Sequence, residues 1–208
     1  MEKQWLSNMK VAIIKYNAGN IFSVDYAMRR LGIEAEITGD PEKILSADKV
    51  IFPGVGEAET TMSYLKAHNL DNLIKSLKQP TLGICIGMQL MCKSSEEATS
   101  GKVDCLGIFD EEVKLFVPDE KTIKVPHMGW NTVSAINGNP LFDGLTNDPY
   151  FYYVHSYHAT VGIDTIATTD YINKYSAALH KDNFYAVQFH PEKSGKVGEL
   201  LLNNFLKL

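Results

Sequence analysis

The segment "TLGICIGMQ", residues 81–89, runs from a short apolar strand directly into a helical pattern, with one cysteine between two glycines. Glycine inside a strand or helix costs about 0.5–1 kcal/mol relative to alanine. The presence of Gly83 and Gly87 therefore indicates that larger side chains would collide at this turn. The form Gly-x-Cys-x-Gly is that of a nucleophile elbow, a sharp turn that exposes the nucleophile, here Cys85, at its apex.

Apolar, β-branched segments alternate with helical spacing on both sides of this turn. Strands are expected at Lys10–Tyr16, Glu34–Thr38, Lys49–Phe52 and Thr81–Ile84, and helices at Ile21–Leu31, from Glu57 to Leu77 and after Cys85. Asn17–Asn20 reads as a turn, with Asn20 as helix cap and Gly32 as helix stop. This alternation predicts an α/β domain with a largely parallel sheet.

From about Gly107 the pattern changes to shorter strand-like segments and one closing amphipathic helix. The segments are Glu112–Phe116, Asn131–Ala135, Phe151–His155, Ser176–His180 and Tyr185–Phe189, followed by the helix Gly195–Leu206. No internal repeat or linker divides the chain. We therefore expect one domain over residues 9–208, preceded by an extension, residues 1–8, to which we assign no role.

Composition excludes several classes of function. The chain has 208 residues, of which 45% are hydrophobic and 22% charged, and its net charge is −5 with dispersed basic residues, so neither a nucleic-acid nor a membrane surface is expected. No apolar run reaches the roughly 18–20 residues of a membrane span, and the first eight residues lack the features of a secretory signal. Three cysteines argue against a disulfide framework and for the cytoplasm.

Cys85 is the candidate nucleophile. At the start of a helix, unpaired N–H groups and the positive end of the helix dipole stabilise a thiolate, the reactive form of cysteine. The N–H of Ile86 would then point to where a substrate oxyanion forms. The alternative is a buried structural cysteine, which is the interpretation we give Cys92 and Cys105 because neither has this context.

The segment "YAVQFHPE", residues 185–192, offers a base for this nucleophile. Its alternation predicts a strand, on which residues two apart share one side, and Pro191 favours extended geometry before it. His190 would take the thiol proton and Glu192 would hold the imidazole tautomer. The alternative is a surface pair beside a loop proline. His155 and His158 suggest a metal pair only weakly, because no third ligand is evident.

The elbow, "PGVG" (Pro53–Gly56) and "FHPE" together resemble the class I glutamine amidotransferases. Further segments, "YNAGN" (residues 16–20), "PHMGWN" (126–131), "YVHSYH" (153–158) and "FHPEKS" (189–194), resemble the glutaminase subunits of imidazole glycerol phosphate synthase. The resemblance spans roughly Met9 to the C-terminus. It implies a single flavodoxin-like domain, with a central mostly parallel sheet flanked by helices, and no cofactor or metal.

The resemblance also implies residue roles. Cys85 would attack the side-chain amide of glutamine to form a thioester, His190 would move the protons, and Glu192 would orient His190. The oxyanion hole would be formed by the backbone of Gly54, Val55 and Ile86, and the glutamine would be held by Gln89, Ser156 and Tyr157. The glycines of "PGVG" agree with this, since they permit close backbone approach to a ligand; the alternative is a plain turn.

A partner follows from the same resemblance. It would be a cyclase subunit with a (β/α)₈ barrel, which forms a heterodimer with this chain and uses its ammonia in histidine biosynthesis. Met128 and Trp130, expected in a loop, are either core anchors or part of a partner surface, and the family places them with Lys193 beside the synthase.

Three alternatives stay open. One is the glutaminase subunit of another pathway, such as anthranilate, aminodeoxychorismate or pyridoxal phosphate synthesis, although "PGVG" followed by "PHMGWN" favours the histidine pathway. The second is a stand-alone cysteine amidase or protease-like member of the same fold. The third is a catalytically silent interaction domain, which would not need Cys85, His190 and Glu192 together.

Overall fold

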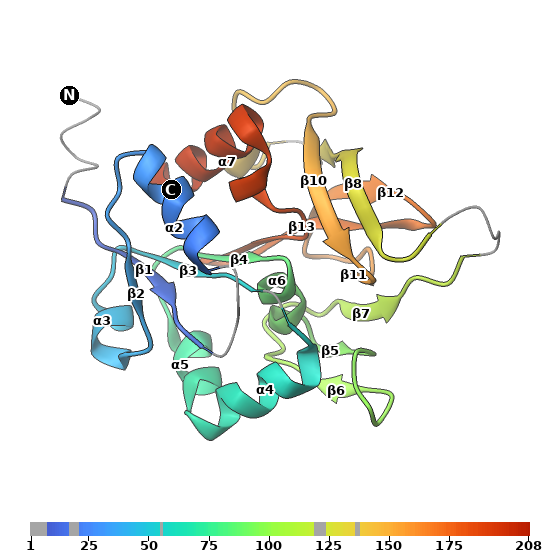
Figure 1. Cartoon of the computed structure of the whole chain (residues 1–208), viewed down its shortest axis with the longest axis horizontal. Coiled ribbons are helices and arrows are strands. Elements are labelled where there is room, and N and C mark those ends of the chain that lie inside the picture. The colour runs from blue at the N-terminus through green and yellow to red at the C-terminus, as the bar shows by residue number, and fades with distance from the viewer. Residues whose placement is uncertain (1–7, 17–20, 55, 119–123, 136–137) are drawn as a thin grey trace.

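A computed structural model describes residues 8–16, 21–54, 56–118, 124–135 and 138–208. The expected turn Asn17–Asn20, its cap Asn20 and Val55, which was expected in the oxyanion hole, lie outside these ranges, as do residues 1–7. Within them, strands alternate with helices through the first half of the chain, as the sequence predicts (Figure 1).

Five parallel strands form the centre of the main sheet. They lie in the order β2 (Glu36–Thr38), β1 (Val11–Ile14), β3 (Lys49–Phe52), β4 (Thr81–Ile84) and β14 (Phe184–Val187). Four of the five are buried along their whole length, which explains their nearly continuous apolar sequences. The order is that of flavodoxin-like sheets, in which ligands bind at the carboxyl ends of the strands.

Helices cover both faces of this sheet. α2 (Ile21–Arg30) and α7 (Gly195–Lys207) lie on one face, whereas α3 (Pro41–Leu45), α4 (Ala58–Ala67) and α5 (Leu70–Ser76) lie on the other (Figure 1). β1 divides its side chains between the two faces: Val11 and Ile13 pack on the α2 side, and Ala12 and Ile14 on the other. α6 (Ile86–Met91) begins at the elbow.

Helix boundaries depart from the sequence prediction in two places. The run from Glu57 to Leu77 is two helices, α4 and α5, because Asn69 adopts a left-handed conformation with φ of 55°. The short helix α3 was missed, although Asp40 caps it by accepting a hydrogen bond from the Glu42 amide at 3.0 Å. Gly32 ends α2 as expected, with φ of +82° and a 3.0 Å bond from the Ile33 amide to the Met28 carbonyl.

Further strands from Ser94 onward extend this sheet beyond β14. β13 (Lys174–Lys181) pairs with β14, and the path continues through β11 (Tyr157–Ala159), β7 (Glu112–Leu115), β5 (Ser94–Ser95) and β6 (Val103–Asp104), while β12 (Thr165–Asp170) pairs with β13 and with β9 (Ser134–Ala135). All of these pairings are antiparallel except the parallel pair of β5 and β7. The expected strand Asn131–Ala135 is divided between β9 and β8 (His127–Thr132).

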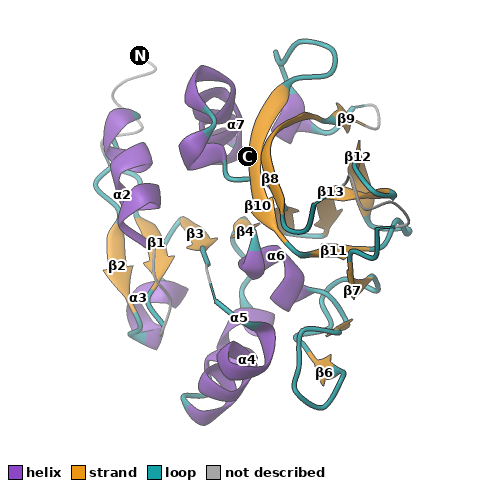
Figure 2. Cartoon of the chain, turned by 45° about the vertical axis from the view of Figure 1, so that its right-hand side comes forward, coloured by secondary structure: helices purple, strands orange, loops and turns teal. Residues whose placement is uncertain are grey.

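β8 pairs only with β10 (Tyr150–His155) among the described strands, and the two curve together beside α7 (Figure 2). Two 3₁₀ turns, Pro140–Phe142 and Pro191–Lys193, complete the described structure. No helix of the described residues is long and apolar enough to cross a membrane.

Candidate active site

Cys85 lies at a strained elbow between β4 and α6. Its φ of 54° and ψ of −111° place a non-glycine residue in a region that is rarely populated. A Cβ on Gly87 would lie 2.1 Å from the Phe52 carbonyl oxygen, and one on Gly83 would lie 3.0 Å from the Gly87 carbonyl carbon. The two glycines are therefore required by close packing, which is the reason the sequence indicated.

His190 and Glu192 are in contact, but their geometry differs from the one inferred from the sequence. β14 ends at Val187, and Glu192 lies in the 3₁₀ turn Pro191–Lys193, so the two residues do not share one side of an extended strand. His190 itself is extended, with φ of −101° and ψ of 91°, as expected before a proline. The turn brings Glu192 Oε1 to 2.8 Å from His190 Nδ1.

The charge state of His190 depends on its anionic neighbours. Burial by itself would lower the pKa of His190, but negative charge on Cys85 and the hydrogen-bonded Glu192 carboxylate outweigh burial and raise that pKa to about 10. Because Glu192 occupies Nδ1, Nε2 remains for the proton of the Cys85 thiol. His190 is therefore cationic at neutral pH, and a cationic imidazole beside a cysteine is the setting in which cysteine nucleophiles are activated.

The other two cysteines differ from Cys85. Burial, followed by the charge of Glu111, raises the pKa of Cys92 well above its ordinary value. Burial also raises the pKa of Cys105 to about 12. Both thiols are thus held in the neutral, inert form, in agreement with the structural role expected for them.

A cavity of about 250 Å³ opens beside the elbow. Its lining residues come from the elbow, from the β10–β11 segment and from the end of β14: Gly56, Cys85, Ile86, Gln89, Glu97, Val154, His155, Ser156, Tyr157 and His190. The structure thus places the expected glutamine-binding residues around the same space as Cys85 and His190. A larger hollow of about 390 Å³ is lined by residues within 134–135 and 138–149 and by none of these groups.

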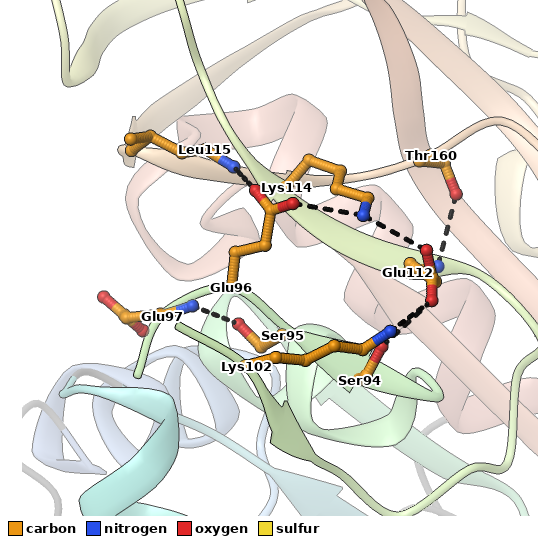
Figure 3. Close-up of polar contacts among 9 residues, drawn as sticks. All are labelled: Ser94, Ser95, Glu96, Glu97, Lys102, Glu112, Lys114, Leu115 and Thr160. Atoms are coloured by element: carbon orange, nitrogen blue, oxygen red, sulfur yellow. Dashed lines mark hydrogen bonds and ion pairs between the residues drawn. The ribbon is translucent and has the colours of Figure 1, made fainter. Parts of the chain in front are cut away.

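Glu97 lines the cavity and was missed in the sequence, where "SSEEAT" gives no signal beyond a polar loop. Its Oε2 accepts a 2.9 Å hydrogen bond from the Ala58 amide at the start of α4, and burial raises the pKa of its carboxyl. Its own amide donates to Ser95 Oγ at 3.1 Å (Figure 3). These bonds fix a carboxylate at the wall of the cavity.

A network of exposed ion pairs supports the segment that carries Glu97. Lys114 Nζ lies 3.1 Å from Glu96 and 3.2 Å from Glu112, and Lys102 Nζ lies 2.7 Å from Glu112 (Figure 3). Exposed pairs contribute only about 0.2–1 kcal/mol each. The 3.0 Å bond from the Leu115 amide to Glu96 ties this network to β7. The Glu96 amide also donates to the Val113 carbonyl at 3.0 Å, so backbone hydrogen bonds and ion pairs together hold the segment.

The described part of "PGVG" lies against the elbow. A Cβ on Gly54 would lie 1.9 Å from Ile86 Cγ2 and 2.3 Å from the Tyr16 hydroxyl, so only glycine fits there. Tyr16 donates a buried 2.5 Å hydrogen bond to the Pro53 carbonyl, which fixes the orientation of the Pro53–Gly54 peptide. Burial, together with the negative charge of Cys85, raises the pKa of Tyr16 and keeps this donor protonated.

The expected partner residues lie on one surface. Met128 and Trp130 are not in a loop but on β8, and they are 64% and 54% exposed, which rules out the alternative that they anchor the core. Trp130 packs edge-on against Tyr152, with ring centroids 6.1 Å apart. Lys193 Nζ lies 6.0 Å from the centre of the same Tyr152 ring. An aromatic and basic patch therefore borders the end of β14.

Three other histidines belong to a buried aromatic cluster next to the cavity, and one of them, His155, also lines it. His127, His155 and His158 pack with Phe116, Tyr153, Tyr171 and Tyr175. Burial lowers the pKa of His155 to about 3, and the pKa values of His127 and His158 to about 4. His155 Nδ1 lies 2.7 Å from the Tyr157 carbonyl. His155 and His158 are therefore neutral, packed residues.

Known proteins share both the sequence and the fold. A family model described as glutamine amidotransferase class-I matches residues 12–208. A Bacteroides fragilis protein named "Imidazole glycerol phosphate synthase subunit HisH" is 64% identical over 200 residues, which are 96% of this chain and 100% of that protein. A Vibrio parahaemolyticus protein of the same name is 48% identical over 206 residues, covering 98% and 100% of the two chains.

Among solved structures, a Thermotoga maritima glutamine amidotransferase superposes with a TM-score of 0.63 at 15% identity, over 96% of this chain and 83% of that chain. The likeness at this identity concerns the fold. The family model and the two relatives go further, since each spans nearly the whole sequence. The chain therefore belongs to the class-I glutamine amidotransferase family.

Proposed function

We propose that this chain is the glutaminase subunit of an imidazole glycerol phosphate synthase. It hydrolyses glutamine to glutamate and ammonia and passes the ammonia to a synthase subunit. The observation that carries the proposal is that Cys85 and His190 line one cavity, while Glu192 lies 2.8 Å from Nδ1 of His190. The relatives that share 64% and 48% of the sequence carry the name of this subunit, which selects it among the amidotransferases.

The catalytic cycle follows from the positions of these groups. The Cys85 thiolate attacks the side-chain amide carbon of glutamine, and His190 gives a proton to the departing nitrogen, so ammonia leaves and a γ-glutamyl thioester remains. Water then attacks the thioester while His190 removes a proton from it; the carbon–sulfur bond breaks and glutamate is released. Glu192 holds Nδ1 of His190, so that Nε2 carries out both proton transfers.

The cavity suits a glutamine molecule with its amide at Cys85. The backbone N–H groups of Gly54, Val55 and Ile86 would stabilise the oxyanion. The Glu97 carboxylate provides the negative charge that the substrate α-ammonium group needs. The remaining polar contacts would come from Gln89, Ser156 and Tyr157, which line the cavity beside Glu97.

The synthase subunit is proposed to be a (β/α)₈-barrel cyclase that joins ammonia to a phosphoribulosyl-carboxamide intermediate. The exposed patch of Met128, Trp130 and Lys193 is the surface proposed to bind it, because a tryptophan and a methionine exposed together are typical of interface centres. Three free cysteines fit a cytoplasmic location for the pair.

The test is glutamine hydrolysis by the chain alone, with the synthase, and with the synthase plus its nucleotide intermediate. We expect weak activity alone and a rise on each addition, because ammonia made without an acceptor is wasted. Cys85→Ser should abolish hydrolysis, while ammonia added directly still supports the synthase. Full activity alone, unchanged by either addition, would instead identify a stand-alone amidase.

A second arm distinguishes the pathway. The same assay with anthranilate, aminodeoxychorismate or pyridoxal phosphate synthase components in place of the cyclase should give no stimulation. A Trp130→Ala variant tests the surface: weaker binding of the cyclase supports the assignment, whereas unchanged binding and stimulation would remove this residue from the interface.

A further inference from the structure

We propose that Gln188 is a further catalytic residue, whose side-chain amide donates a hydrogen bond to the sulfur of Cys85 and stabilises its negative charge. The proposal rests on the proposed function, in which Cys85 is the nucleophile. Gln188 is fully buried, and its Nε2 lies 3.7 Å from Cys85 Sγ, a distance typical of a hydrogen bond to the larger sulfur atom.

The backbone holds the two residues in register. β4 and β14 are adjacent parallel strands, and the Cys85 amide donates to the Val187 carbonyl at 2.8 Å. The Gln188 amide donates in turn to the Ala177 carbonyl of β13 at 2.8 Å. Cys85 and Gln188 thus follow the ends of neighbouring strands, where their side chains meet without any movement of the chain.

The backbone carbonyl of Tyr157 fixes the orientation of the Gln188 amide through Gln89, because a carbonyl oxygen can only accept a hydrogen bond. Gln89 Nε2 lies 2.8 Å from that oxygen, so this end of Gln89 must be its NH₂ group. The same nitrogen lies 2.9 Å from one terminal atom of Gln188, which must therefore be the oxygen Oε1. The other end of Gln188, toward Cys85, is then its NH₂ group, and no choice of amide flip remains.

Charge appears on the sulfur at two points of the reaction. The thiolate carries it before attack, and the electron pair returns to sulfur when the carbon–sulfur bond of the thioester breaks. A buried N–H donor stabilises both states, because hydrogen bonds to an ionised partner are roughly twice as strong as neutral ones. Gln188 does not titrate, so it supplies a fixed dipole, while His190 moves the protons.

The experiment measures alkylation of Cys85 by iodoacetamide as a function of pH in the full chain, with the site read by mass spectrometry. Only the thiolate reacts, so the pH of half-maximal rate reports its stability. Gln188→Met keeps the volume without the donor, and it should move this pH upward by about one unit, a tenfold loss of rate below the midpoint. Gln188→Glu should move it further, since a carboxylate would face the sulfur.

Other titratable groups around the sulfur stay unchanged in these variants. The charge of Cys85 raises the pKa of both His190 and Tyr16, and Glu97, His155 and Tyr157 line the same cavity. Gln79→Glu is the matched control, because Gln79 bonds to the Ile44 carbonyl, away from this cavity, and should leave the profile in place.

Folded Gln188 variants, checked by circular dichroism, that alkylate with the unchanged profile would overturn the proposal. If neither variant folds, Gln89→Met makes the same test, because it removes the bond that orients Gln188; a smaller upward shift supports the proposal and an unchanged profile overturns it. Failure of the proposed function looks different: Cys85→Ser would keep glutaminase activity, whatever the alkylation profile of Gln188 variants.

Discussion

His190 and His155 are both buried, at 1% and 7% exposure, yet their basicities move in opposite directions. Burial would lower the pKa of His190, but the charges of Cys85 and Glu192 raise it to about 10. Burial lowers the pKa of His155 to about 3, because its hydrogen-bond partners, the Tyr157 carbonyl and Tyr175, carry no negative charge, and neighbouring histidines, His190 among them, lower it further.

The contrast shows how one residue type serves two purposes in one fold. Just after β14, a histidine between two acidic groups has a raised pKa and carries a positive charge at neutral pH. In the aromatic cluster next to the cavity, three histidines serve as flat, polar-edged packing residues, neutral near pH 7. Burial is common to both regions, so the difference depends on which charged groups the fold brings near.

The largest expected effect tests whether catalysis depends on His190, with its acidic neighbours, and not on the neutral histidine cluster. His190→Ala removes the proton carrier and should lower glutamine hydrolysis about 10²–10⁴-fold in the presence of the synthase. His158→Phe keeps the stacking on Phe116, whose ring centroid lies 4.2 Å away, and should change the rate only slightly. Near-normal turnover of His190→Ala, measured by glutamate release, would end the catalytic assignment.

Glu192 tests what maintains the raised basicity of His190. Glu192→Ala removes the carboxylate at 2.8 Å, so the pKa of His190 should fall, and the loss of rate should be about tenfold smaller than for His190→Ala because the base remains. Imidazole titration by NMR and steady-state kinetics measure the two effects. Glu199→Ala is the control, because Glu199, on α7, pairs with Arg30; an equal loss there would point to a general effect of removing charge.

The free energy of unfolding should fall in acid because His127, His155 and His158 are buried in the neutral form. These histidines have folded pKa values below the unfolded 6.5, so the unfolded chain binds more protons, and stability is present above pH 6.5 and is lost toward pH 4. His190, raised above 6.5, contributes with the opposite sign, and its contribution is lost toward pH 10.

The measurement is urea unfolding of the unmodified chain and of His158→Phe between pH 7 and 4. Each pKa unit corresponds to about 1.4 kcal/mol, so the variant should lose on the order of 1–3 kcal/mol less than the unmodified chain. Identical losses in the two proteins would contradict a neutral, buried His158.

The smallest expected effect is that of removing the Tyr16 hydroxyl, which lies beside the site of Cys85 and His190. Tyr16→Phe removes the bond to the Pro53 carbonyl, worth about 0.5–1.5 kcal/mol, so the Gly54 peptide is held less firmly and hydrolysis should change a few-fold. The free energy of unfolding and the glutaminase rate report the two consequences. Tyr26→Phe, at a tyrosine 62% exposed on α2, should alter neither; a similar change there would remove the special role of Tyr16.

Local patterns in the sequence were sufficient to predict the elbow, the parallel strands and the contact between His190 and Glu192. Each depends on residues within a few positions of one another: two glycines around Cys85, continuous apolar strands, and a proline between the histidine and the glutamate. His190 is extended as inferred, but the extended geometry inferred for Glu192 was wrong, because alternation of residue types does not distinguish the end of a strand from a 3₁₀ turn.

Other features exist only once distant segments are brought together. Glu97 reaches the cavity through a bond to Ala58, 39 residues away, and Gln188 reaches Gln89 across 99 residues. Met128 and Trp130 are exposed because β8 pairs with β10 and places alternate side chains outward. The protonation state of each histidine also depends on residues that are distant in the sequence, because charge and burial act through space. The order of residues alone does not specify which groups become neighbours.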